Sequence, residues 1–112
     1  MEKVNPMTSV EFPELVNERA HERTLLGAID SYLSQLAHVR PYLVSGYRDV
    51  LEHMAEVWLK KGGENQLAAL TPLWLNLHIG DATFVAERQL RRESISDFLA
   101  WTKREGLVMS AL

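Results

Sequence analysis

Two groups of titratable side chains in this 112-residue chain are spaced so that they could bind a metal ion or share a proton. Glu18 and His21 have the Glu-x-x-His spacing of the metal ligands in ferritin-like helical bundles. His78 and Asp81 are also three residues apart, so on a helix they would be neighbours. Together with Glu22, these residues are candidate metal ligands between two helices.

The candidate ligand set is incomplete for such a bundle. The helix expected at 41–61 adds no inward carboxylate, because Glu52 and Glu56 fall on its polar face. We therefore assign no metal or cofactor, and keep a ferritin-like metal-binding bundle as a second alternative.

His78 and Asp81 fall on the apolar side of their expected helix. A buried carboxylate without a partner is costly or takes up a proton. We therefore expect Asp81 to pair with His78, with Arg88 or with a group on another helix, in a polar network that is buried or spans the dimer.

The chain has none of the common signatures of nucleophilic or phosphate-transfer catalysis. It lacks a G-x-S-x-G turn, a glycine-rich phosphate loop and an H-E-x-x-H pair. It also has no cysteine, which excludes disulfides, thiolate zinc sites and cysteine nucleophiles. We therefore expect a non-enzymatic protein.

The elements that must position these residues are all helices. Apolar residues recur at helical spacing over an expected helix at 13–38 and a second at 41–61. Pro41 separates these two helices, and Gly62 and Gly63 end the second. The fold class is therefore all-α.

Two further helices are expected after residue 70. Thr71 and Pro72 are typical of a helix start, which predicts a helix over 72–92. Ser94 and Asp97 have the spacing of a capping box, which predicts a short helix over 95–105 that ends at Gly106. The expected architecture is a small bundle of three long helices and a short C-terminal one.

The stretch from 67 to 86 is the most apolar part of the chain. Polar residues interrupt it too often for a membrane span, so we interpret it as the core of a buried helix. A helix that is apolar on most sides needs neighbours on most sides, and one short chain supplies few. We therefore expect a homodimer. The candidate interface residues are Trp58, Trp74, Leu77, Phe84 and Trp101.

A helix-turn-helix-like transcriptional regulator that binds DNA is the first alternative. The helices 72–92 and 95–105, with a short break between them, could imitate that motif. The candidate nucleic-acid contacts are Arg88, Arg91, Arg92, Lys103 and Arg104. Nearby carboxylates nearly cancel this basic patch, which argues against a nucleic-acid partner.

Length, charge and composition limit the number of domains, the kind of partner and the cell compartment. The chain fits one helical domain over 1–112, with an extended lead at 1–12 and an apolar tail at 107–112. A net charge of −3 gives no general attraction to nucleic acid or anionic membrane. The first residues lack the apolar run of a signal peptide, so we expect a cytoplasmic protein. The expected function is that of a small protein–protein interaction module, acting as a regulator, adaptor or inhibitor and forming a homodimer.

Overall fold

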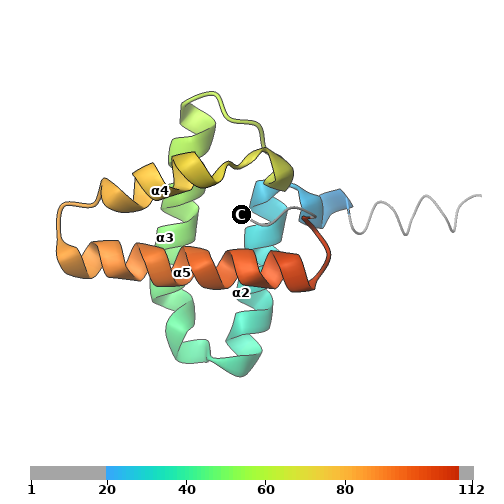
Figure 1. Cartoon of the computed structure of the whole chain (residues 1–112). Coiled ribbons are helices and arrows are strands. Elements are labelled where there is room, and N and C mark those ends of the chain that lie inside the picture. Colours follow the sequence, from blue (N-terminus) through green and yellow to red (C-terminus); the bar gives the residue numbers. More distant parts are fainter. Residues whose placement is uncertain (1–19, 109–112) are drawn as a thin grey trace, which may run out of the picture.

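The computed structural model describes residues 20–108, and this part of the chain is helical without a strand (Figure 1). The predicted all-α class is confirmed. The expected lead at 1–12, the candidate ligand Glu18 and the last four residues lie outside the described part. None of the described helices is both long and apolar enough to cross a membrane. The elements in chain order are α2 (Leu25–Val39), α3 (Pro41–Lys60), the 3-10 turn η1 (Leu67–Ala69), α4 (Pro72–Gly80) and α5 (Val85–Arg104).

The helices α2 and α3 form an antiparallel hairpin with a very short turn (Figure 1). Its boundary at Arg40 and Pro41 is the predicted one, because a residue before proline avoids helical backbone angles. The start of α2 differs from the prediction. Residues 20–23 are helical, but the helix is interrupted at Thr24, whose hydroxyl oxygen accepts the backbone N–H of Gly27 at 3.0 Å.

The core lies where α5 crosses the hairpin (Figure 1). Phe98 of α5 is fully buried, and its ring meets Tyr32 of α2 edge to face at 5.6 Å. Leu51 and Met54 complete this centre from α3. Since large buried side chains supply most of the apolar area removed from water, this crossing holds the three long helices together.

The predicted break at residues 92–94 is wrong, as is the capping box at Ser94. The helix α5 runs without interruption from 85 to 104, so the short helix is α4 and the last one is long. Ser94 is fully buried in the middle of α5, and its hydroxyl donates to the carbonyl of Leu90 at 2.7 Å. A serine that bonds back to the preceding turn needs no helix end, so the local capping pattern was misleading.

The long helices α3 and α5 are each followed by a glycine with a positive φ angle. Gly62 follows α3 with φ of 93°, and Gly106 follows α5 with φ of 72°. After α5, the N–H of Leu107 bonds to the carbonyl of Thr102 at 2.9 Å, and Leu107 is buried. The prediction that Gly106 ends the helix is therefore confirmed, and Leu107 packs back against the protein.

Gly63 is the tightest point of the turn after α3, and replacing it should destabilise the fold. A β-carbon there would overlap the indole of Trp58, whose N–H donates to the carbonyl of Glu64 at 2.8 Å. We expect Gly63→Ala to displace the indole and lower the free energy of unfolding by about 1–3 kcal/mol. Urea denaturation checks this result.

Gly46→Ala is the matched control. A β-carbon at Gly46, inside α3, meets no heavy atom within 4 Å. It should stabilise the helix by up to about 1 kcal/mol. If the Gly63 variant is as stable as the Gly46 variant, the packing of Trp58 on Gly63 is unimportant.

Candidate interaction surface

The short helix α4 is held at its start by its own sequence. The hydroxyl oxygen of Thr71 accepts the N–H of Trp74 at 3.2 Å, and Pro72 occupies the first helical position. Both residues were expected to start a helix here. This start directs Leu75, His78 and Ile79 into the protein.

The end of α4 is held by α5. The guanidinium of Arg91 is buried and donates to the main-chain carbonyl of His78, in the last turn of α4. Its second nitrogen is 3.3 Å from the Glu87 carboxylate. Arg88 donates to the carbonyl of Ala82 at 3.3 Å, within the connection between the helices. A cation at the end of a helix satisfies free carbonyls and complements the helix dipole, so these arginines stabilise the break at 81–84.

His78 lies in a row of aromatic rings between α3 and α4. Its imidazole stacks on Trp74 at 5.1 Å and lies 5.7 Å from His53. Trp74 in turn meets Trp58 edge to face at 5.0 Å. We call these four residues, Trp58, Trp74, His78 and His53, the aromatic row.

The imidazole of His78 is neutral at neutral pH. Burial lowers its pKa from 6.5 to about 4, and the positive charge of Arg91 and the ring of His53 act in the same direction. Its Nε2 atom is buried and has no hydrogen-bond partner in the described structure. Because the ring is neutral and stacked, it serves α4 as a packing group.

The expected polar network of His78, Asp81 and Arg88 does not form. His78 is buried, but Asp81 is exposed, and within residues 20–108 no hydrogen bond or ion pair joins their side chains; the backbone N–H of Asp81 donates to the carbonyl of His78 at 3.3 Å. The reason is that α4 ends at Gly80, so Asp81 follows the helix instead of continuing its inner face. Arg88 turns toward the connection at Ala82, as described above.

The candidate metal ligands that the structure describes are not brought together. Between residues 20 and 108, no three histidine, aspartate or glutamate side chains are close enough to hold a metal ion. His21 lies beside α2, whereas His78 is buried under Trp74. The described residues therefore give the metal-binding alternative no support.

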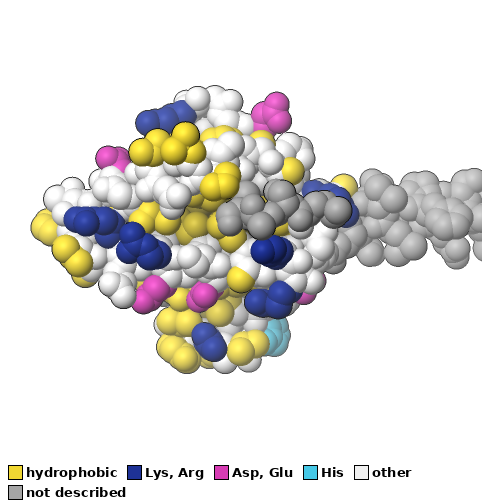
Figure 2. Space-filling view, viewed as in Figure 1, with side chains coloured by type: hydrophobic (Ala, Val, Ile, Leu, Met, Phe, Trp, Pro, Cys, Tyr) yellow, Lys and Arg dark blue, Asp and Glu magenta, His cyan; other side chains and the backbone are white. Residues whose placement is uncertain are grey.

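The candidate nucleic-acid contacts are divided between the inside and the outside of the protein. Arg91 is 9% exposed and occupied by His78 and Glu87, so it is not available to a phosphate backbone. Arg92, Lys103 and Arg104 are exposed along α5, among acidic residues of the same helix (Figure 2). The two helices proposed for the motif also have other boundaries, since the break falls at 81–84.

Large apolar side chains are exposed along α4 and where α4 turns into α5. Leu73 and Leu77 are 71% and 64% exposed on α4, and Phe84 and Val85 are each 70% exposed at the start of α5. We call these four residues the α4–α5 apolar surface. Figure 2 shows hydrophobic side chains at this end of the molecule. Large exposed apolar patches are typical of interaction sites, which makes this surface a candidate.

The other interface candidates lie elsewhere. Trp101 is only 4% exposed and packs in the core, contrary to the expectation. Its indole N–H donates to the side chain of Gln35 at 3.1 Å. Trp58 and Trp74 are half-buried in the aromatic row. Leu77 and Phe84 are therefore the predicted interface residues that the structure exposes.

Comparisons of the chain with protein-family models, with curated proteins and with solved structures found no match. The function must therefore be inferred from the surface and the contacts themselves.

Replacing Arg91 should loosen α4. In Arg91→Ala the carbonyl of His78 loses its buried donor, and Glu87 loses its cation. We expect the free energy of unfolding to fall by about 1–3 kcal/mol, measured by chemical denaturation. Arg92→Ala is the control, since this exposed neighbour should change stability by less than about 0.5 kcal/mol. Equal effects of the two substitutions would contradict a role for Arg91 in holding α4.

Acid should destabilise the fold through His78. Because its pKa is about 4 in the folded protein and 6.5 in the unfolded chain, the unfolded state binds more protons between these values. Stability should therefore fall as the pH drops from 6.5 to about 4, by up to about 3 kcal/mol from this residue. Below pH 4 this contribution should level off.

The measurement is the free energy of unfolding of the protein and of His78→Leu across this pH range. Carboxylates titrate in both proteins, so the difference between them isolates the imidazole. We expect the variant to lose less stability in acid, while His38→Gln, at an exposed site, behaves as the parent. Parallel pH profiles for the parent and His78→Leu would refute the assignment.

Proposed function

We propose that this protein is a non-enzymatic, helical protein–protein interaction module whose contact face is the α4–α5 apolar surface. The observation that carries the proposal is the exposure of Leu73 and Leu77 on α4, a helix whose ends are held in place, and of Phe84 and Val85 at the start of α5, each at least 64% exposed. A fixed helix loses little conformational entropy on binding. A rigid apolar face is therefore suited to recognition.

The partner that best fits this face is a second copy of the chain. The sequence of α4 contains no charged residue, so two copies can meet there without like-charge repulsion. Leu73 and Leu77 are one helical turn apart, and an antiparallel pair of α4 helices would bury both in each copy. A twofold dimer would also carry two copies of every surface that lies outside the contact.

That doubling supports a role as a regulator, adaptor or inhibitor. Val39 and Tyr42 at the turn between α2 and α3 are 73% and 78% exposed. They form a second apolar surface, distinct from the α4–α5 apolar surface. In a dimer this second surface would be presented twice to another protein.

Self-association tests the proposal directly. We expect light scattering coupled to size exclusion to give a dimer at protein concentrations on the order of 10–100 µM. Leu73→Glu combined with Leu77→Glu should give a monomer that is still folded, because both side chains are mainly exposed and the new carboxylates would face their copies. The expected weakening is at least about tenfold.

The matched control is Val39→Glu combined with Tyr42→Glu. These residues are as exposed as the leucines but lie at the α2–α3 turn, so this variant should remain a dimer. A monomeric parent protein overturns the proposed self-association. Equal dissociation of both double variants shows that the contact does not use α4.

A further inference from the structure

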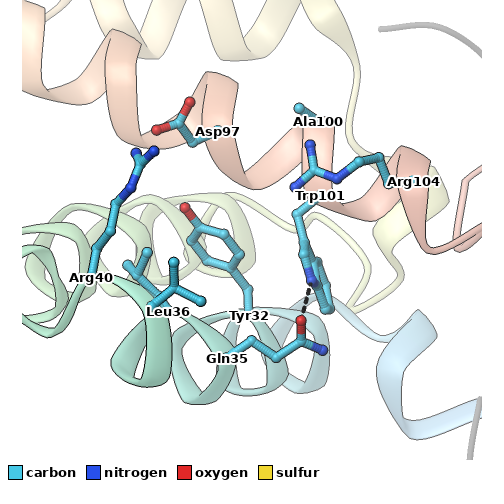
Figure 3. Close-up of a pocket in the computed structure, with 9 residues that line it drawn as sticks. Tyr32, Gln35, Leu36, Arg40, Asp97, Ala100, Trp101 and Arg104 are labelled. Carbon is cyan, nitrogen blue, oxygen red and sulfur yellow. Dashed lines mark hydrogen bonds between the residues drawn. The ribbon is translucent and has the colours of Figure 1, made fainter.

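A cavity of about 330 Å³ lies between α2 and α5, on surfaces that the proposed dimer does not use (Figure 3). Its lining comes from the last two turns of α2, from Arg40, and from the second half of α5. This volume is at the small end of the range of about 300–1,000 Å³ that is typical of ligand sites. A molecule with a single ring and a short side chain fits such a volume.

The floor of the cavity is aromatic and held in position. Tyr32 and Trp101 are both buried, and their rings lie 5.7 Å apart. The indole N–H of Trp101 donates to the amide oxygen of Gln35, the bond drawn in Figure 3. Leu36 and Val39 add an aliphatic wall from α2. The apolar part of a ligand would therefore meet a preformed surface.

The rim of the cavity carries two exposed cations, Arg40 and Arg104. Within residues 20–108 their guanidinium groups make no hydrogen bond or ion pair. In Figure 3 their guanidinium groups lie on the two sides of the cavity, Arg40 toward Asp97 and Arg104 beside Trp101. Guanidinium groups bind carboxylates through paired N–H donors.

Asp97 limits how much negative charge the cavity can accept. One of its oxygens accepts the hydroxyl of Tyr47 at 3.1 Å, and the carboxylate lines the cavity. Two cations and one anion leave a single excess positive charge. A second carboxylate on the ligand would meet Asp97 and be repelled.

Tyr32 contributes a neutral hydroxyl. Burial, together with the negative charge of Asp97, raises its pKa to about 12. The hydroxyl points into the cavity in Figure 3 and is therefore available as a hydrogen-bond donor.

We infer that this cavity binds a small organic monocarboxylate, with an apolar ring against Trp101 and Leu36 and its carboxylate at Arg40 or Arg104. Both halves of the ligand are needed. The arginines alone are solvated and would hold a bare anion weakly, because exposed ion pairs contribute little. The aromatic floor alone gives no preference for an acid.

The first test uses 3-phenylpropionate as the probe and the indole N–H signal of Trp101 as the readout, in two-dimensional NMR of the full chain. We expect a saturable shift of this signal at millimolar probe. The signals of Trp58 and Trp74 should not move, since both belong to the aromatic row between α3 and α4. The neutral 3-phenylpropionamide should bind at least tenfold more weakly, and acetate and inorganic phosphate should cause no saturable shift.

The second test removes the cations. Arg40→Gln combined with Arg104→Gln should weaken binding of 3-phenylpropionate at least tenfold without loss of folding, because both side chains are exposed. Arg48→Gln combined with Arg92→Gln removes the same charge outside the cavity and should leave binding unchanged. The monomeric Leu73→Glu, Leu77→Glu variant should also bind as the parent does, so this test is independent of the dimer.

Three results would overturn the inference. They are the absence of a saturable shift at Trp101, equal binding of the acid and its amide, and equal binding by the two double arginine variants. Each points to a cavity without a carboxylate site.

Discussion

The end of α4 is held by a hydrogen bond from α5, from the Arg91 guanidinium to the carbonyl of His78. A helix of nine residues has little stability of its own, because its nucleus is costly and most of its backbone groups lie near an end. Thr71 supplies the cap at the start, and Arg91 supplies a buried donor at the end. Glu87 stabilises the charge of Arg91, which would otherwise be buried without a counterion.

This constraint explains why α4 can keep large apolar residues in water. Its inner face packs through Leu75, His78 and Ile79, and its ends are fixed from outside the helix. The outer residues Leu73 and Leu77 are therefore not needed to hold α4 against the protein. Different residues of α4 therefore hold the helix in place and face the solvent. The exposed leucines are available for the contact proposed above.

The parts of the fold that could be predicted from the sequence are those set by local chemistry. Pro41 separates α2 from α3, Thr71 starts α4, and Gly106 ends α5, each through its own backbone or side chain. The break between α4 and α5 could not be predicted in the same way. The end of α4 is capped by Arg91, which lies thirteen residues beyond the carbonyl of His78 that it binds. Ser94 has the sequence pattern of a helix start but is buried within α5.

The same distinction separates the two candidate sites. Leu77 and Phe84 could be named as interface candidates from the sequence because one apolar stretch contains both. The cavity at Trp101 unites residues 32–40 with residues 97–104, so no local spacing relates Arg40 to Arg104. Trp101 itself was expected at an interface because of its residue type, whereas its indole is held in the floor of the cavity by Gln35. The residue type could indicate that Trp101 makes important contacts. Only the crossing of α5 over α2 determines which atoms its ring contacts.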